Sequence, residues 1–298
     1  MNNLPFRKPG RFYRGNLHTH SNRSDGELPP EEVIAAYRAQ GYDFLALTDH
    51  FLPQYNFPIT DTRAFRDARF TTLPGAELHA PQTSAGRLWH IIAVGLPDDF
   101  APPTPDETGP ALAARAAAAG AFVGIAHPAW YTLTLDDGLS IEAAHAVEVF
   151  NATSVWDNDR GDGWYFCDML LARGRRLLAY AADDAHFSIR PDTFVGWVEV
   201  RAEELSPEAI LSRESLSGTA VTFTIRRGNG HYGGSHERIA AHYQDCPARL
   251  SKPSRSTPAR SCTIAQSHRC TSDASQRPCG FWQNHGDAGG DRHAAEAC

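Results

Sequence analysis

Two histidines and an aspartate stand close together near the amino terminus, in the stretch NLHTHSNRSDG. One residue separates His18 from His20, and Asp25 follows five residues later. A similar pair, Asp184 and His186, occurs in the stretch AADDAH. Residues two apart in a strand point to the same side, so each pair can present two donor atoms to one place. Imidazole and carboxylate groups together are typical ligands of zinc, manganese or iron.

Other side chains of this kind lie at the ends of apolar segments that have the pattern of buried strands. They are Asp49 and His50 after YDFLALT, Glu77 in FTTLPGAEL, His127 after AFVGIA and Asn151 in VEVFNA. His90 differs, because it begins the segment WHIIAVGL instead of ending it. Helical segments such as PPEEVIAAYRAQG and GWYFCDMLLARG alternate with the strands, which predicts an α/β barrel or a doubly wound sheet. An α/β barrel builds its active site at the carboxyl ends of its strands, where these side chains lie.

The candidate ligands are too many for one metal ion, which takes four to six donor atoms. A cluster of two or three ions is therefore predicted, with a carboxylate such as Glu77 as the bridge. Two ions about 3.5–4 Å apart can share a hydroxide, lower its pKa toward neutrality and clamp both oxygens of a displacement at phosphorus. We expect two or three divalent transition-metal ions, of Mn, Zn or Fe, as cofactors.

The motifs NLHTHSNRSDG, LALTDH, PGAEL, IAHP and ADDAH, in this order, resemble the PHP (polymerase and histidinol phosphatase) superfamily of metal-dependent hydrolases. The resemblance covers about residues 12–200. The stretches YRGNLHTHSNRSDG and VEVFNATSVWDNDRGDGWYFCDMLLARG further resemble the CehA/McbA-type branch. The resemblance implies an α/β fold, a distorted (β/α)7 TIM-like barrel that holds up to three metals.

The resemblance also implies a ligand set for each ion. The first ion would take His18, His20, Glu77 and Asp184; the second would share Glu77 and add His90 and His127; the third would take Asp25, His50 and His186. Asp184 is preferred to Asp183 because the family pattern is Asp-x-His, and Asp183 is expected to support the site. Asp49 precedes His50 and would point away from it, so a structural role is expected.

Catalytic roles are predicted for four residues, namely Glu77, Asp184, Asn151 and Arg160. Asn151 ends a strand and could touch metal or substrate, and Arg160 could hold a substrate anion from the loop DNDRGDG. His79 and His145 are expected to be ordinary polar residues, the first just beyond a strand and the second on a helix. The aromatic residues Trp130, Tyr131 and Trp156 either wall the pocket or belong to the core.

The leading functional hypothesis is hydrolysis of a phosphoester by metal-bound hydroxide, with a phosphorylated small molecule as substrate. One alternative keeps the metals but cleaves an amide, carbamate or ester. Another is an unstable or inactive PHP-like protein. A net charge of -7 argues against a nucleic-acid partner, and no apolar run suggests a membrane span or signal peptide. We therefore expect a cytoplasmic protein; the sequence leaves its oligomeric state open.

The composition changes toward the carboxyl end. We predict a metallohydrolase barrel over residues 1–227 and a disordered tail over residues 228–298. The tail contains few large apolar residues and is dense in Ser, Pro and Arg in stretches such as SKPSRSTPARS, so it cannot bury enough surface to offset its ordering entropy. Five of the six cysteines also follow residue 240, with no metal-binding spacing. A shifted reading frame after VTFTIRRGNG would explain the abrupt change.

Overall fold

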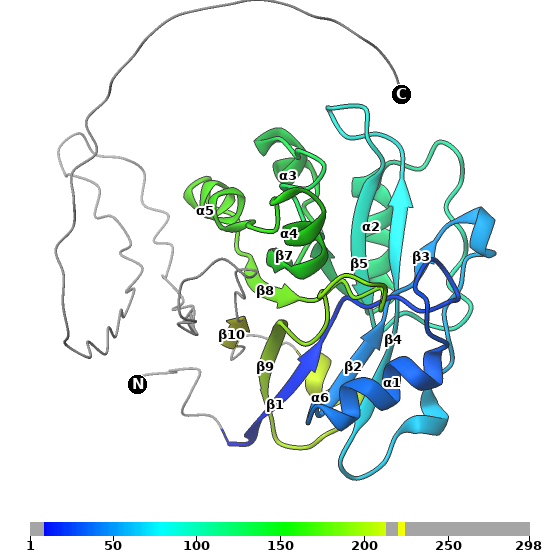
Figure 1. Ribbon diagram of the computed structural model, residues 1–298. Helices are drawn as coiled ribbons and strands as arrows, with labels where there is room; N and C mark the ends of the chain where they lie inside the picture. Colours follow the sequence, from blue (N-terminus) through cyan, green and yellow to red (C-terminus); the bar gives the residue numbers. More distant parts are fainter. Residues whose placement is uncertain (1–8, 213–219, 224–298) are drawn as a thin grey trace, which may run out of the picture. The chain divides into compact units, whose positions relative to one another are not determined.

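The computed structural model describes residues 9–212 and 220–223 (Figure 1). The strands are β1 (Arg11–Asn16), β2 (Phe44–Leu47), β3 (His50–Phe51), β4 (Thr71–Ala80), β5 (Trp89–Val94), β6 (Phe122–Ile125), β7 (Ala146–Asn151), β8 (Leu178–Ala182), β9 (Gly196–Ala202) and β10 (Ala220–Phe223). The α-helices are α1 (Pro30–Ala39), α2 (Gly109–Ala118), α3 (Leu135–Ser140), α4 (Ala152–Asn158), α5 (Trp164–Ala172) and α6 (Pro207–Leu211). Two short 3-10 helices, η2 (Pro53–Tyr55) and η3 (Arg63–Phe65), lie between β3 and β4.

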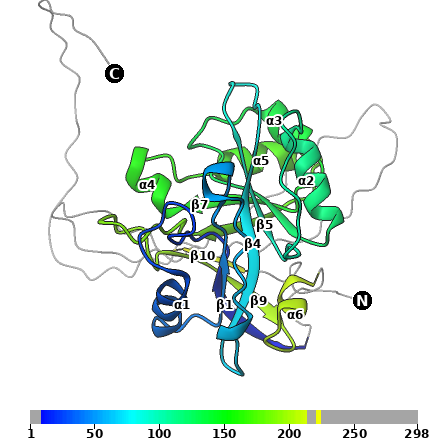
Figure 2. The ribbon, with the colours of Figure 1, turned by 90° about the vertical axis from the view of Figure 1, so that its right-hand side faces the viewer.

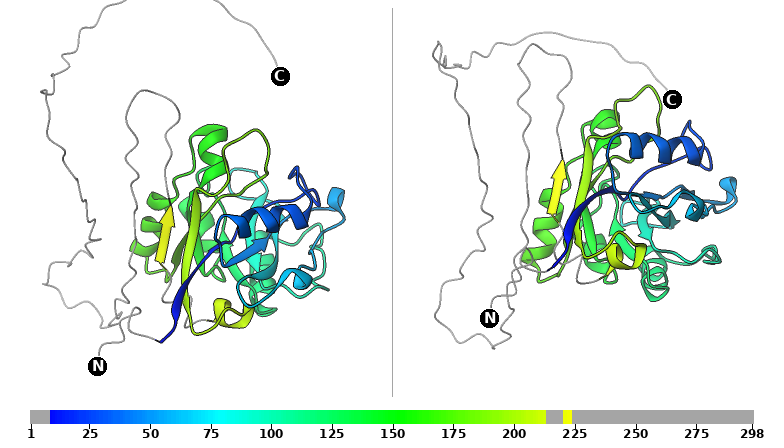
Figure 3. Two further views of the ribbon diagram at one scale, coloured as in Figure 1. Left: turned by 60° about the horizontal axis from the view of Figure 1, so that its bottom comes forward. Right: turned by 90° about the horizontal axis from the view of Figure 1, so that it is seen from below.

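The ten strands found among the described residues belong to one mixed sheet. Its order is β10-β9-β1-β2-β4-β5-β6-β7-β8, and β3 pairs with β4 beside this path. Neighbours β1/β2, β2/β4, β6/β7 and β7/β8 run parallel, whereas β5 is antiparallel to both β4 and β6. Strand β9 is antiparallel to β1 and to β10, which lies beside it in both views of Figure 3. The sheet therefore contains two parallel segments joined through the antiparallel β5.

The sheet curves into a nearly closed barrel, and the loops that follow β1 and β8 pair with each other. Thr19 and Ala185 form a parallel bridge there, with hydrogen bonds from the His20 amide to the Ala185 carbonyl and from the Asp184 amide to the His18 carbonyl. At the same end of β8, the first residue of β9 is Gly196, where an added Cβ would lie 2.5 Å from the carbonyl oxygen of Ala182, the last residue of β8. Glycine therefore permits the close approach of β9 to β8.

Helix α1 shows how the sequence produces a covering helix. Pro30 occupies the first helical position, acidic residues stand in the first turn, and Arg38 stands in the last turn, as the helix dipole favours. Val33, Ile34 and Tyr37 are buried at helical spacing, which directs one face inward. The helix packs against β2, while α2 packs against β4, β5 and β6 (Figures 1 and 2).

Strands β2 and β6 are buried in the way that covered parallel strands are. All four residues of β2 and of β6 are buried, and the three large apolar clusters of the core combine strand residues with the inner faces of helices. Helix α5 packs against β7 and α3, and α6 packs against β9 and β4. Within residues 9–212 and 220–223, no helix combines the length and the apolar character needed to cross a membrane.

The barrel prediction is confirmed, with local differences. The segment SIEAAHA does not form a helix. Helix α3 begins earlier, after Thr134, which forms a capping box with Asp137, and it ends at Ser140. Strand β1 ends at Asn16, so His18 and His20 lie on the loop after it. The predicted boundary at residue 227 and the tail at 228–298 lie outside the described residues.

Candidate metal centre

The side chains predicted to bind metal gather at one edge of the sheet. They come from the loop after β1, from β3, β4, β5 and the loops after β6 and β8, and they are His18, His20, Asp25, His50, Glu77, His90, His127, Asp184 and His186. Their donor atoms form overlapping groups in which all atoms lie within 4.8 Å of one another. His18, His20 and Glu77 are fully buried, whereas Asp25, His50 and His186 are partly exposed. The centre thus has a buried half and an open half.

Glu77 lies at the middle of the centre. Its Oε1 atom is 2.7 Å from Nδ1 of His90 and 3.2 Å from Nε2 of His127. Its Oε2 atom is 3.8 Å from Nε2 of His18, 3.7 Å from Nε2 of His20 and 2.6 Å from Nδ1 of His50. Each carboxylate oxygen therefore faces a different set of histidines. This is the arrangement that a bridging carboxylate requires.

The buried half contains donor atoms without hydrogen-bond partners. Nε2 of His18, Nε2 of His20 and Oε2 of Glu77 are buried, and none makes a hydrogen bond. Nevertheless, the two ring nitrogens lie 3.1 and 2.9 Å from Oδ1 of Asp184. Ligands about 2.0–2.2 Å from one ion are separated by roughly 3–3.5 Å, so these atoms are spaced as ligands of a shared ion would be. Because unsatisfied buried polar atoms are costly, the residues fit a metal ion.

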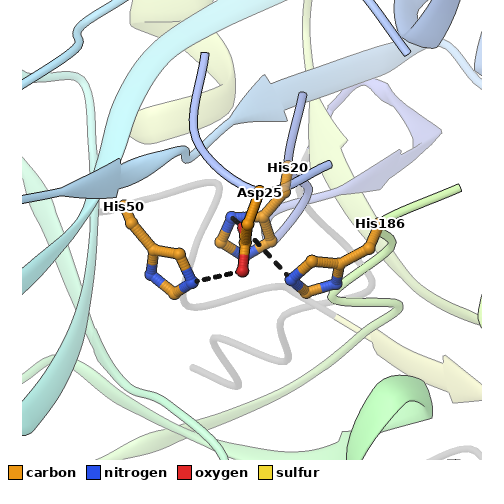
Figure 4. Close-up of side chains that lie close together, drawn as sticks. All are labelled: His20, Asp25, His50 and His186. Atoms are coloured by element: carbon orange, nitrogen blue, oxygen red, sulfur yellow. Dashed lines mark ion pairs between the residues drawn. The ribbon is translucent and has the colours of Figure 1, made fainter. Parts of the chain in front are cut away.

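The open half is organised around Asp25, as Figure 4 shows. Its carboxylate oxygens lie 3.3 Å from Nε2 of His50, 3.4 Å from Nε2 of His186 and 3.7 Å from Nδ1 of His20. Asp25 comes from the loop after β1, His50 from β3 and His186 from the loop after β8. Three segments distant in the sequence thus present donor atoms to one place.

Asp49 holds the loop that carries Asp25. It accepts hydrogen bonds from the amide and hydroxyl of Ser21, at 2.7 and 2.8 Å, and from the hydroxyl of Ser24, at 2.8 Å. Gly26 follows in a tight turn, where an added Cβ would lie 2.9 Å from the backbone of Ser21. The serines are therefore occupied by a structural carboxylate, which agrees with the structural role predicted for Asp49.

His90 reaches the centre because of the direction of its strand. Strand β5 runs antiparallel to β4, so the beginning of β5 lies beside the end of β4, and His90 pairs with His79. The exception noted in the sequence, a candidate ligand at the start of a strand, therefore follows from the topology. His90 and His127 both face Oε1 of Glu77, as the second predicted ligand set requires.

Glu148 was not predicted as part of the site. It lies within β7 with 1% of its surface exposed and accepts hydrogen bonds from Nδ1 of His18 at 3.0 Å and from the amide of His127 at 2.6 Å. A hydrogen bond to Nδ1 leaves Nε2 of His18 as the donor atom toward the centre. The signal available in the sequence was a carboxylate inside the apolar strand VEVF, since such residues are rarely buried without a partner.

His79 was expected just beyond a strand as an ordinary polar residue, which is wrong for its position. It lies inside β4 and is 4% exposed, and its Nε2 atom is 2.8 Å from Nδ1 of His50. Glu77 and His79 are two residues apart in one strand, the same spacing that singled out His18 and His20. Applying that rule to the stretch GAELHA would have found it.

Asn151 and Arg160 occupy different surroundings. Asn151 is fully buried; its side-chain oxygen caps α4 through the Ser154 amide, and its Nδ2 donates to Glu148 at 2.9 Å and to Asp184 at 3.1 Å. Arg160 is exposed after α4, and among the described residues only its backbone amide makes hydrogen bonds, to Ser154 and Asn158. Their catalytic roles stay predictions, but the contacts of Asn151 are those of a group that orients Asp184.

Asp183 supports the junction between β8, β1 and β9. Its Oδ2 atom accepts from the Tyr37 hydroxyl at 2.6 Å and from Nδ2 of Asn16 at 3.2 Å, and its carboxylate also accepts from three backbone amides of residues 194–196. Burial raises the pKa of Asp183 to about 7, although these hydrogen bonds oppose the shift. Both carboxylate oxygens of Asp183 accept hydrogen bonds from these donors, as expected of a residue that supports the site.

Electrostatic surroundings differ between the histidines of the two halves. Burial, with the neighbouring His186 and His50, lowers the pKa of His20 to about 4. Burial also opposes protonation of His50 and His186, but the carboxylates of Glu77 and Asp25 raise the pKa of His50 to about 11, and Asp25 and Asp184 raise the pKa of His186 to about 9. Without a metal, His50 and His186 in the open half are therefore protonated at neutral pH, whereas His20 is a neutral imidazole.

These pKa values predict that metal binding at the open half releases protons. A raised pKa keeps His50 and His186 protonated below about pH 9, and a proton on the donor atom must leave before the ion binds. Affinity should rise by up to about tenfold per displaced proton for each pH unit between pH 6 and 8. Calorimetric titration of the metal-free protein with Mn²⁺, in buffers of different ionisation enthalpy, measures the protons released. An uptake that releases no protons would contradict this assignment.

Aromatic side chains border the centre. Trp130 is 37% exposed, and its ring centroid lies 5.5 Å from that of His90 and 5.4 Å from that of His127. Tyr131 is buried and donates from its hydroxyl to the His90 carbonyl. The sequence left open whether these residues wall the pocket or belong to the core. Trp130 lies at the wall of the centre, whereas Tyr131 is buried behind it and contacts the backbone of His90.

Comparisons with known proteins bear on the fold. No protein-family model matches the chain, and no curated protein matches it. A two-domain protein from Bacteroides vulgatus ATCC 8482, described as containing a predicted PHP-like metal-dependent phosphoesterase, is 21% identical over 74% of this chain and 68% of that chain, with a TM-score of 0.48. PsfC from Pseudomonas syringae PB-5123 is 17% identical over 72% of this chain and 92% of that chain, with a TM-score of 0.50. The chain shares its fold with PsfC.

A further similar structure is an amidohydrolase from Chromobacterium violaceum with bound sulfate and no metal. It is 19% identical over 58% of this chain and 87% of that chain, with a TM-score of 0.43. Identities this low concern the fold alone. The barrel fold that the motifs implied is thus confirmed, while the CehA/McbA-type branch stays a prediction.

Proposed function

We propose that this chain is a metal-dependent hydrolase that cleaves phosphoesters. The observation that carries the proposal is the convergence of buried ring nitrogens and carboxylate oxygens that make no hydrogen bonds with one another, although they lie 2.9–3.8 Å apart. Such atoms are stable together when a cation satisfies them. The donor set of imidazole and carboxylate suits Mn, Zn or Fe.

We assign the donor atoms to two or three ions in the sets that the motifs imply. The first takes His18, His20, Glu77 and Asp184; the second takes Glu77, His90 and His127; the third takes Asp25, His50 and His186. When bound, ions in such a cluster supply a water molecule of lowered pKa and positive charge at the reacting phosphorus. Glu77 holds the first two sets together, and Asn151 and Glu148 orient Asp184 and His18.

The balance of charge favours an anionic substrate. Six of the nine proposed ligands are histidines, which bind metals as neutral groups, and only Asp25, Glu77 and Asp184 bring negative charge. Three divalent ions would therefore outweigh these carboxylates together with the buried Glu148 and leave a positive centre, whereas two ions would balance them. The described residues contain no lysine, and the side chain of Arg160 makes no hydrogen bond or ion pair with another described residue. Recognition of a phosphate is thus assigned to the ions themselves.

The distribution of exposure sets the direction from which a substrate enters. Glu77, His18 and His20 have 0–1% exposed side chains, whereas those of His50 and His90 are 16% and 15% exposed. A substrate therefore reaches the centre from the side of Asp25, His50 and His90. The exposed ring of Trp130 beside His90 would contact the organic part of the substrate and keep water from that side.

The test combines metal analysis with a substrate screen. Purified protein should carry two or three Mn, Fe or Zn ions per chain after reconstitution, and it should hydrolyse phosphomonoesters or phosphodiesters with added Mn²⁺. Carboxyl esters, carbamates and amides form the second part of the screen. Turnover of carboxyl esters, carbamates or amides alone would support a metal-dependent hydrolase that does not cleave phosphoesters. The absence of any transition metal after reconstitution would refute the whole proposal.

A further inference from the structure

His79 is the one histidine in contact with the centre to which no ligand role was assigned among the described residues. It lies in β4 two residues after Glu77, so both side chains point to the same side of the sheet. Its Nε2 atom is 2.8 Å from Nδ1 of His50, and its Nδ1 atom is 3.1 Å from the carbonyl oxygen of Trp89. With 4% of its surface exposed, the ring is held between these two partners.

The partners determine where the protons lie. The carbonyl of Trp89 can only accept, so Nδ1 of His79 carries the proton of that hydrogen bond. A neutral imidazole has a single N–H, which leaves Nε2 of His79 as an acceptor. The proton of the next hydrogen bond therefore belongs to Nδ1 of His50. The other nitrogen of His50, Nε2, is then the one available to a metal.

That second nitrogen of His50 faces the open half of the centre. Nε2 of His50 lies 3.3 Å from Oδ2 of Asp25, and the group of His20, Asp25, His50 and His186 surrounds it (Figure 4). The chain of contacts runs from the Trp89 carbonyl through His79 and His50 to this group. A hydrogen bond of this kind commonly fixes the tautomer and the orientation of a metal-binding histidine.

Glu77 alone does not provide the same acceptor. Its Oε2 atom is 2.6 Å from Nδ1 of His50, but the same oxygen also faces Nε2 of His18 and Nε2 of His20 at 3.8 and 3.7 Å. An ion bound by those nitrogens would draw on the lone pairs of that oxygen. His79 offers His50 an acceptor on the side away from Asp25, so the orientation of His50 does not depend on Glu77 alone.

We propose that His79 is a positioning residue, which fixes His50 in the tautomer whose Nε2 binds the ion held by Asp25 and His186. The proposal rests on the metal-dependent function proposed above. It adds a residue that the motifs do not contain and gives it a role through His50. His79 itself is not a ligand in this arrangement, because its Nε2 atom accepts the His50 proton.

The experiment compares two replacements of His79. Phenylalanine keeps a ring of similar size but has no acceptor, whereas the side-chain oxygen of glutamine can accept the His50 proton. Binding of Mn²⁺ is measured by equilibrium dialysis at pH 7.5. His79→Phe should weaken one metal equivalent about 10- to 100-fold, the range for partners of metal-binding histidines, while His79→Gln stays within about threefold of the unaltered protein. His145→Gln is the matched control, since His145 precedes β7 at the opposite edge of the sheet.

A second measurement uses the unaltered protein and does not depend on the stability of any variant. Long-range ¹H–¹⁵N spectra of the metal-free protein with labelled histidine should show a proton on Nδ1 of His79 and none on Nε2; the signal is assigned by its loss in His79→Gln. A His79 ring protonated at Nε2 would overturn the proposal. So would a His79→Gln variant as defective as His79→Phe, which would indicate a direct ligand. Failure of the unaltered protein to bind any Mn²⁺ would instead refute the proposed function.

Discussion

Replacing Glu77 with alanine is expected to lower kcat/KM by at least about a thousandfold and to remove more than one metal equivalent per chain. The reason is geometric. One oxygen of Glu77 faces His90 and His127, and the other faces the histidines of the loop after β1. Without the carboxylate, both proposed ions lose a ligand and the link between them. Metal analysis and steady-state kinetics on the same preparation measure the two effects.

Asn151→Ala provides the comparison for this prediction. Asn151 donates to Asp184 and Glu148 without facing the histidine sets, so its removal should cost less activity and leave most of the metal in place. If Glu77→Ala kept near-normal metal content and turnover, the assignment of Glu77 as a bridge would be wrong. A larger loss for Asn151→Ala than for Glu77→Ala would also contradict it.

The second large effect is expected at Glu148, which is not among the site residues predicted from the sequence. Glu148→Leu removes the acceptor for Nδ1 of His18, for the His127 amide and for Nδ2 of Asn151, all of them buried. Leaving buried donors unsatisfied costs about 1–3 kcal/mol each, so the free energy of unfolding should fall by about 3–5 kcal/mol. Metal binding by His18 should weaken as well, because its ring loses the group that orients it.

Urea unfolding of the metal-free protein separates stability from metal binding in this variant. Glu199→Leu serves as the matched control, because Glu199 lies in β9 with a partly exposed side chain and should change stability by less than about 1 kcal/mol. Glu148→Gln keeps one acceptor oxygen and should retain part of the lost stability. An unfolding free energy unchanged in Glu148→Leu would show that these hydrogen bonds do not hold the site.

Much of the centre could be predicted from the sequence because the rule that places it is local. Strand residues two apart share a side, and polar groups that end buried strands of an α/β barrel meet at one edge. His18, Glu77, His127 and Asp184 follow these rules, and the structure brings their donor atoms together. The alternation of strands and helices likewise predicted the barrel. Strands and helices can each be recognised from the spacing of apolar residues over a short stretch of sequence.

The features of the centre that only the tertiary structure decided depend on pairing between segments that are distant in the sequence. His90 joins the centre only because β5 runs antiparallel to β4, a direction that no local period encodes. The bridge between Thr19 and Ala185 brings the loops after β1 and β8 together, although 165 residues separate them along the chain. The partners of Glu148 and His79 are fixed by the same closure. A hydrogen bond between side chains is specified by where two strands lie in space, and the spacing of either residue within its own strand does not carry that information.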